Sequence, residues 1–227
     1  MSVIVIEGLD GAGKSTQVNL LKEYLNERNL PFKYLHFPRV EGGIFGDLVA
    51  RFLRGEFGDN KSVNPYLVAL IYAEDRQDAR KMLLQWINDG NIVILDRYVY
   101  SNIAYQCAKV ENAEEKEKLK KWILDLEFGY YNLPRPVLNV FFDVPFMFTS
   151  RKLTENRTGN EREYLQGMRD IHEEDLDFQQ KVREVYLTLA NEPSFIRLDC
   201  SRNNSEMLSP AEIFSKLKPL IENTLTR

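Results

Sequence analysis

The sequence has few of the residues that build disulfide frameworks or metal clusters. It contains only two cysteines, Cys107 and Cys200, and two histidines. Neither cysteine belongs to a CxxC or CxxH pair, so the spacing argues against a structural zinc site and against a disulfide framework. Free, isolated cysteines are typical of a reducing compartment, and we therefore expect a cytoplasmic protein.

Long apolar runs and an excess of positive charge are also absent. No apolar run approaches the ~20 residues needed to span a bilayer, and the first residues, MSVIVIEG, lack the basic and long apolar regions of a signal peptide. We therefore expect no membrane association. The 30 Lys and Arg residues are outnumbered by 34 Asp and Glu, for a net charge of −4. This balance argues against bulk binding of nucleic acid.

The 227 residues instead alternate short apolar runs with helical patterns. The β-branched run at 2–6 (SVIVI) is typical of a strand buried on both faces of a parallel sheet. The other predicted strands are at 32–37, 92–95, 137–144 and 194–198. Residues 65–89 contain no internal Pro or Gly and predict one long helix. The pattern predicts an α/β fold, a doubly wound parallel sheet of about five strands flanked by helices, as one domain over residues 1–227.

Two segments interrupt this alternation. Residues 40–64 are rich in glycine and charge, and we expect a short helix within them. The segment at about 154–168 is very polar and includes TENRTGNEREYLQ. A polar insertion between helices of a compact domain is a candidate for a lid that closes over a site.

A phosphate-binding loop follows the first predicted strand. Residues 8–15 read GLDGAGKS, a full match to GxxxxGK[ST], with a strand before the loop and an amphipathic helix after it. Backbone N–H groups of such a loop cradle a polyphosphate at the helix N-terminus. Lys14 would place its charge on the β- and γ-phosphates, and Ser15 would offer its hydroxyl to Mg²⁺. The ATP-binding residues predicted here are Gly8, Asp10, Gly11, Ala12, Gly13, Lys14, Ser15 and Thr16.

The loop alone leaves several classes of protein open. A GTPase usually carries NKxD, but Asn60-Lys61 is followed by Ser62-Val63, and a motor or helicase needs a longer chain. A small chain with a lid favours a kinase of small molecules. Two alternatives remain: a deoxynucleoside kinase, which needs a carboxylate base, and a non-catalytic nucleotide-binding protein.

Further charged residues come at the ends of two predicted strands. Asp96 and Arg97 follow the strand at 92–95, and Arg39 closes the strand at 32–37. Asp96 fits the position of a Walker-B acid that holds Mg²⁺, and Arg97 can bridge two phosphates with its planar fork of donors. Ligands of doubly wound sheets bind outside the carboxyl ends of the strands. We therefore expect Arg39 to face the same crevice.

Six motifs together resemble the thymidylate kinase family. They are IEGLDGAGKSTQ (6–17), FPR (37–39), YAEDR (72–76), DRYVYSNIAYQ (96–106), LPRPVLNVFFDVP (133–145) and DIHEEDLDF (170–178). They occur in the family's order, and the range that they span, residues 6–178, covers most of the chain. The resemblance implies transfer of the γ-phosphoryl group of Mg-ATP to dTMP, with Mg²⁺ as cofactor. It also implies a homodimer.

The resemblance also implies roles for individual residues. Asp10 is similar to the family's acid near the sugar 3′-hydroxyl, and Arg39 and Arg97 to the arginines on the dTMP phosphate. Arg76 is similar to the arginine on the base edge. Tyr72 takes the place of a stacking ring that is often Phe in the family. The substrate-binding residues implied in this way are Asp10, Phe37, Arg39, Tyr72, Arg76, Arg97, Ser101, Asn102 and Tyr105.

The family differs in where its catalytic arginine lies. Some members carry it within the phosphate loop, at the position of Gly11 in this sequence. Members without it are expected to supply an arginine from the lid. We therefore predict a catalytic arginine in the lid, with Arg157 and Arg162 preferred over Arg151 and Arg169. The other predicted catalytic residues are Lys14, Arg97 and Asp96.

Overall fold

Five parallel strands form the centre of the computed structural model. The model describes residues 3–154, 164–166, 170–173, 175–192, 194–203 and 206–226, with the side chains of 152–154 excepted. The strand order is β2-β3-β1-β4-β5, which confirms the predicted α/β fold. The strands are β1 (Val3–Gly8), β2 (Phe32–His36), β3 (Ile92–Asp96), β4 (Leu138–Asp143) and β5 (Phe195–Asp199).

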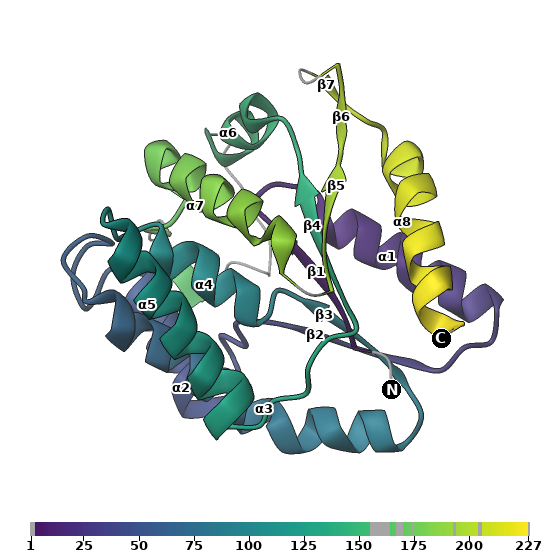
Figure 1. Ribbon diagram of the computed structural model, residues 1–227, viewed down its shortest axis with the longest axis horizontal. Coiled ribbons are helices and arrows are strands. Elements are labelled where there is room, and N and C mark those ends of the chain that lie inside the picture. The colour runs from purple at the N-terminus through teal and green to yellow at the C-terminus, as the bar shows by residue number, and fades with distance from the viewer. Residues whose placement is uncertain are drawn as a thin grey trace.

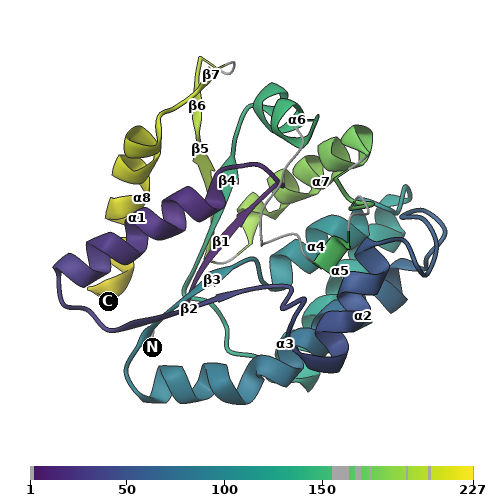
Figure 2. The same ribbon diagram turned by 180° about the vertical axis from the view of Figure 1, so that it is seen from behind.

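Helices cover both faces of this sheet, because successive side chains of a strand point to opposite faces. Val3 and Val5 of β1 face one apolar cluster, and Ile4 and Ile6 face the other. The second cluster lies beneath α1 and α8, and the first beneath α3, α4, α5 and α7 (Figures 1 and 2). The helices are α1 (Lys14–Glu27), α2 (Gly43–Leu53), α3 (Pro65–Asn88), α4 (Val99–Cys107), α5 (Ala113–Leu124), α6 (Phe146–Thr154), α7 (Leu176–Thr188) and α8 (Pro210–Leu225).

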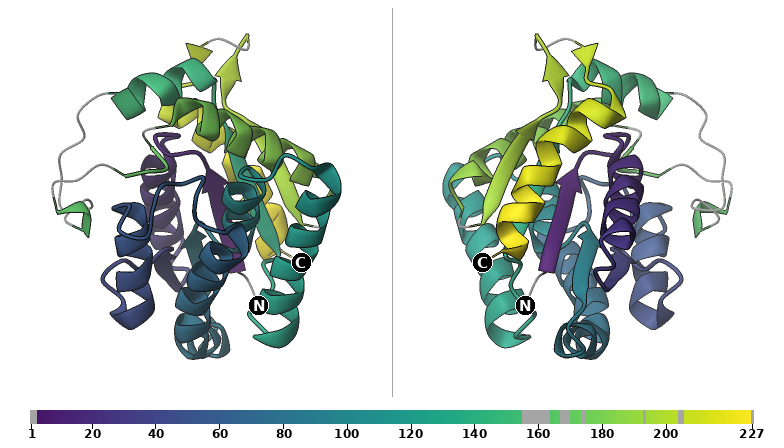
Figure 3. Two further views of the ribbon diagram at one scale, coloured as in Figure 1. Left: turned by 90° about the vertical axis from the view of Figure 1, so that its left-hand side faces the viewer. Right: turned by 90° about the vertical axis from the view of Figure 1, so that its right-hand side faces the viewer.

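The two ends of the sheet differ. The chain enters β1 near the end where α8 finishes, so both termini lie at the amino ends of the strands (Figure 3). The carboxyl ends of the strands lead into the phosphate loop, α4 and α6. The hairpin of β6 (Ser201–Arg202) and β7 (Glu206–Met207) also stands at this end (Figure 1). The loops at the carboxyl ends are therefore the part of the fold placed to bind a ligand.

The predicted elements agree with the observed ones to within one or two residues at most boundaries. The helix predicted at 65–89 is α3, and the short helix expected within 40–64 is α2. Several elements were not predicted, among them α4 and α6. Residues Asp125–Tyr130 form the π-helical segment η1, and β6 pairs with β7 over two residues each. Strands of two residues are too short for a periodic pattern to reveal.

Helices long and apolar enough to cross a membrane are absent from the described part of the chain. Most of the predicted lid at about 154–168, with Arg157 and Arg162, lies outside the described residues, and so does Arg169.

Candidate active site

The phosphate loop runs from the end of β1 into α1 and depends on two glycines. Gly11 and Gly13 both have φ of +77°, a left-handed conformation that glycine adopts without strain. The Lys14 Nζ atom lies beneath this loop and donates to the carbonyls of Leu9 (3.1 Å) and Gly8 (3.4 Å). Burial and the neighbouring Arg97 lower the pKa of Lys14. The lysine is thus held in place inside the loop.

Asp10 and Arg97 form an ion pair above the loop. An Arg97 Nη2 atom lies 2.6 Å from Asp10 Oδ1, and the Tyr105 hydroxyl donates to Asp10 Oδ2 at 2.7 Å. Gln179 of α7 also donates to Asp10 Oδ2, at 3.3 Å. Although burial opposes its ionisation, the charges of Arg97 and Lys14 hold the pKa of Asp10 well below its usual range. Asp10 is therefore a fixed carboxylate that orients Arg97 and Tyr105.

Glu7 binds the segment that follows Arg97 and so helps to position the Asp10–Arg97 ion pair. Its side chain is fully buried and accepts hydrogen bonds from the backbone N–H groups of Tyr98 and Ser101. It also accepts from the hydroxyls of Ser101 and Tyr186. Burial raises the pKa of Glu7. Because its oxygens bind groups of the scaffold, Glu7 anchors the turn from β3 into α4, where Arg97 adopts a φ of +68°.

Asp96 ends β3 beside the loop lysine. Burial would raise its pKa, but Lys14 and His36 lower it, so the group is a carboxylate. Its Oδ2 atom lies 3.3 Å from His36 Nδ1, whereas its Oδ1 atom is buried without a hydrogen-bond partner among the described residues. A hard cation such as Mg²⁺ prefers oxygen ligands, so Asp96 fits the predicted metal role. No group of three or more His, Cys, Asp or Glu in the described ranges could hold a metal ion by itself.

Arg76 and Asn102 meet a third buried residue that the sequence did not point to. Arg76 Nε and Nη2 donate to Glu127 Oε2 (2.5 Å) and Oε1 (2.7 Å). Asn102 Nδ2 donates to the same Glu127 Oε1 at 3.0 Å and to Ala69 O at 2.9 Å. Glu127 lies in η1, 51 residues from Arg76. Its distance along the chain explains why no motif revealed it.

Tyr72 lies on α3 one helical turn before Arg76, so both side chains lie on the same side of α3. Its ring packs edge-on against Phe52 of α2, with centroids 6.5 Å apart. Asp170 and His172, quoted in a motif but given no role, are buried nearby. Burial and the charge of Asp10 raise the pKa of Asp170 to about 7. His172 packs against the rings of Tyr105 and Phe52.

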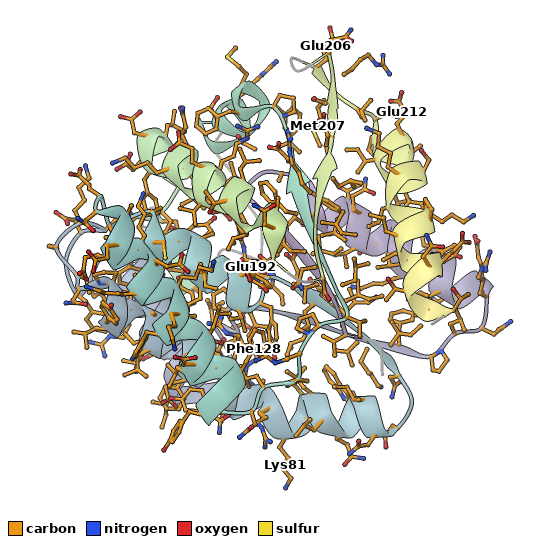
Figure 4. The ribbon with its side chains drawn as sticks, in the orientation of Figure 1. Lys81, Phe128, Glu192, Glu206, Met207 and Glu212 are labelled. Carbon is orange, nitrogen blue, oxygen red and sulfur yellow. The ribbon has the colours of Figure 1, made fainter. Side chains whose placement is uncertain are left out.

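One cavity of about 1280 Å³ joins these groups. It extends from the phosphate loop to the Arg76 cluster. Met207 of the hairpin, which is labelled in Figure 4, also lines it and lies close to Gly13. The predicted site residues that line it are Asp10, Gly11, Ala12, Gly13, Lys14, Ser15, Thr16, Phe37, Tyr72, Arg76, Asp96, Arg97, Ser101, Asn102 and Tyr105.

Gly8 and Arg39 are the predicted binding residues in the described ranges that do not line the cavity. Gly8 is the last residue of β1 and the first residue of the loop motif. Arg39 is turned toward α3, where its Nε donates to Asp75 Oδ1 (2.9 Å) and its Nη2 to Asp78 Oδ2 (2.6 Å). The neighbouring Pro38 and Val40 do line the cavity. The structure therefore places Arg39 at the edge of the site, bound by acidic side chains.

A parallel α/β sheet with a complete phosphate loop and an acid at the end of the neighbouring strand defines the class of P-loop nucleotide-binding proteins. The family model described as thymidylate kinase matches residues 6–209. A thymidylate kinase of Mycobacterium tuberculosis is 36% identical over 190 residues, which are 83% of this chain and 85% of that protein. A probable thymidylate kinase of Pyrobaculum aerophilum is 32% identical and covers 96% of this chain and 98% of its own length.

The fold agrees with a solved structure as well. The thymidylate kinase of Candida albicans superposes with a TM-score of 0.70 over 98% of this chain and 91% of its own, at 24% identity. That likeness concerns the fold, whereas the family model and the sequence relatives identify the family. The chain belongs to the thymidylate kinase family.

Proposed function

We propose that this protein transfers the γ-phosphoryl group of Mg-ATP to dTMP and releases dTDP and ADP, as a step of dTTP synthesis. One observation carries the proposal: a single cavity joins the phosphate loop to the cluster of Tyr72, Arg76 and Asn102. The loop suits the polyphosphate of ATP, and the cluster offers an aromatic ring and polar edges for a base.

The reaction needs positioning and charge neutralisation more than a covalent intermediate. An oxygen of the dTMP phosphate attacks the γ-phosphorus of ATP, and the bond from that phosphorus to the β–γ bridging oxygen breaks. The attacking oxygen is already ionised, so no general base is required. Lys14 and Arg97 contribute positive charge to the transferring group, and Asp10 holds Arg97 in place.

Mg²⁺ would bind between the loop and β3. Ser15 and Asp96 both line the cavity. The Oδ1 atom of Asp96 has no hydrogen-bond partner among the described residues and is an available oxygen ligand. The ion would supply charge that neutralises the phosphates of ATP. Asp10 and Tyr105 are the proposed sugar contacts, because the Tyr105 hydroxyl is tied to Asp10 at 2.7 Å and presents its ring to the cavity.

A single domain with a lid at about 154–168 completes the proposed enzyme. Gly11 leaves the phosphate loop without an arginine, so a further cation would come from Arg157 or Arg162 when the lid closes. The protein would work in the cytoplasm as a homodimer. Two exposed apolar side chains, Ile44 at 78% and Leu67 at 60%, lie on the neighbouring helices α2 and α3 and suit such a contact.

The environment of Glu7 weighs against a deoxynucleoside kinase. Such an enzyme needs a carboxylate that takes a proton from a sugar hydroxyl. Both oxygens of Glu7 accept hydrogen bonds from the scaffold, and the residue does not line the cavity.

The test is a panel of acceptors with Mg-ATP. We expect dTMP to be phosphorylated well above dCMP, dGMP, AMP and free thymidine. The measurement is kcat/KM for each acceptor under the same conditions. Faster phosphorylation of thymidine than of dTMP would overturn the proposal.

A further inference from the structure

Glu127 is a buried carboxylate whose two oxygens contact both side chains of the proposed base pocket. It is 0% exposed, Arg76 is 2% and Asn102 is 3% exposed. The three side chains come from separate elements, η1, α3 and α4. Figure 4 labels Phe128, the next residue of η1, which follows α5 in the chain. A carboxylate buried this deeply needs partners for its charge, and Arg76 supplies the opposite charge through two hydrogen bonds.

The hydrogen bonds decide which way the Asn102 amide points. An amide nitrogen has two hydrogens to donate and no lone pair to accept with. Asn102 Nδ2 uses them on Glu127 Oε1 and Ala69 O, which are both pure acceptors. A flipped amide would set its oxygen against these two oxygens. Glu127 and Ala69 therefore fix the amide with Oδ1 on the other side.

The amide oxygen of Asn102 is left as an unused acceptor at the wall of the cavity. Asn102 lines the cavity, and its Oδ1 atom is buried without a hydrogen-bond partner among the described residues. A buried polar atom without a partner is costly, so such an atom in a cavity indicates a donor on the ligand. Arg76 also lines the cavity. It binds Glu127 through Nε and Nη2, so its Nη1 group is not used in that contact.

We infer that Glu127 sets the hydrogen-bond polarity of the base pocket, so that the pocket accepts an N–H from the ring and donates to the adjacent carbonyl. This inference rests on the proposed function. Thymine has this edge, with N3–H as donor and O4 as acceptor. Cytosine has the reverse, with N3 as acceptor and an amino group as donor. Glu127 is thus a positioning residue that selects against cytosine without touching the base.

The test compares the ratio of kcat/KM for dTMP to that for dCMP in the wild type and in Glu127→Gln. In the variant only the amide oxygen accepts and the amide nitrogen only donates, so the side chain cannot accept all three hydrogen bonds that Arg76 and Asn102 give to Glu127. Hydrogen bonds to charged groups of this kind correspond to about tenfold or more. We expect the ratio to fall by about tenfold, mainly through a higher KM for dTMP with kcat changed less.

Asp143→Asn is the matched control. Asp143 is also buried, at 2%, and binds Arg183 through two hydrogen bonds, but it does not line the cavity. We expect its substrate ratio to equal that of the wild type. Glu127→Asp is a second variant, because it keeps the negative charge that Arg76 needs but is one methylene too short to reach both partners. We expect the substrate ratio of Glu127→Asp to fall as well. This variant provides the test if Glu127→Gln does not fold.

A double-mutant cycle separates this role from general loosening of the fold. Asn102→Ala removes the acceptor, so Glu127→Gln should lower the ratio no further in that background. A folded Glu127→Gln protein with a ratio within about twofold of the wild type would overturn the inference. Wild-type protein that does not prefer dTMP would instead overturn the proposed function, so the two failures are distinguishable.

Discussion

The phosphate end and the base end of the cavity are built in different ways. At the phosphate end, the loop of residues 8–15 supplies backbone donors, a lysine and a hydroxyl from one continuous stretch. At the base end, Arg76, Asn102 and Glu127 come from three elements and meet only in the folded chain. The proposed phosphate site is therefore local in the sequence, whereas the proposed base pocket depends on tertiary packing.

The two ends also differ in how their charges are satisfied. Arg97 at the phosphate end bonds to Asp10 and Tyr105, which themselves line the cavity, so a ligand can exchange with these bonds. Arg76 at the base end bonds to Glu127, which does not line the cavity. We expect substitutions at the phosphate end to change kcat and those at the base end to change KM and substrate choice.

Lys14→Ala should have the largest effect. Removal of one preorganised cation from the transition state typically lowers kcat by about 10³-fold, and the fold should persist because Lys14 serves charge more than packing. The measurements are kcat with dTMP and the thermal unfolding midpoint. Lys33→Ala, a change of an exposed lysine on β2 outside the cavity, is the control. Near wild-type turnover in Lys14→Ala would show that the loop is not used in catalysis.

The next effect concerns the proposed lid. Gly11 leaves the loop without an arginine. In the proposed mechanism Lys14 and Mg²⁺ would neutralise the β–γ side of the transferring group, so its outer oxygens would need another cation. Single Ala substitutions at Arg151, Arg157, Arg162 and Arg169 should include at least one that lowers kcat by about tenfold or more, with Arg157 and Arg162 preferred. The readout is kcat and the KM for dTMP, measured separately. If all four keep kcat within tenfold of the wild type, Arg97 must carry this charge alone.

The difference between the two ends also explains what the sequence could reveal. The strands at 92–96 and 138–143 are apolar runs buried on both faces, and the loop is a contiguous motif, so both were predictable. The resemblance added Arg76 and Asn102. Glu127 could not be predicted, because its place opposite Arg76 depends on the π-helical segment η1 and on packing across 51 residues.

Arg39 is the residue that the sequence placed only approximately. The position of Arg39 at the end of a strand predicts that its backbone lies beside the crevice. It does not predict whether the side chain points into the crevice. The Arg39 guanidinium binds Asp75 and Asp78 of α3. No pattern in the sequence predicts these two ion pairs. Asp75 and Asp78 lie on α3, the helix that also carries Arg76. Arg39, the residue expected to bind the acceptor phosphate, is therefore held at the edge of the proposed base pocket.

Arg39→Ala should weaken dTMP binding more than ATP binding. A guanidinium on a dianionic phosphate contributes ~1.5–3 kcal/mol through charged hydrogen bonds, which is roughly tenfold or more in affinity. Release of Arg39 from Asp75 and Asp78 would offset part of this gain. The measurement is the Kd of each ligand by calorimetry, with ATP as the internal control. An equal loss for both ligands, or none for dTMP, would contradict the assignment.

Gly46→Ala tests the same position without removing its charge. A Cβ atom at Gly46 would lie 2.0 Å from the carbonyl oxygen of Arg39, so the backbone around Arg39 must shift. We expect a severalfold weaker dTMP affinity, somewhat less than for Arg39→Ala. Gly129→Ala is the matched control, because a Cβ there meets nothing within 4 Å. Unchanged dTMP affinity in a folded Gly46→Ala protein would show that the position of Arg39 is not important.

The smallest effect is expected from Tyr72→Phe at the base end. The proposed role of Tyr72 is to stack its ring on thymine, and this change keeps the ring and its edge-on contact with Phe52. The family resemblance also allows Phe at this position. We therefore expect the KM for dTMP to change by less than about twofold, whereas Tyr72→Ala should raise it by about tenfold, because stacking of a base on an aromatic ring contributes about 1–3 kcal/mol. Steady-state kinetics of both variants gives the comparison. A large loss in Tyr72→Phe would mean that the hydroxyl, and not the ring, contacts the substrate, and the base end would then contain one more polar contact than we have assigned to it.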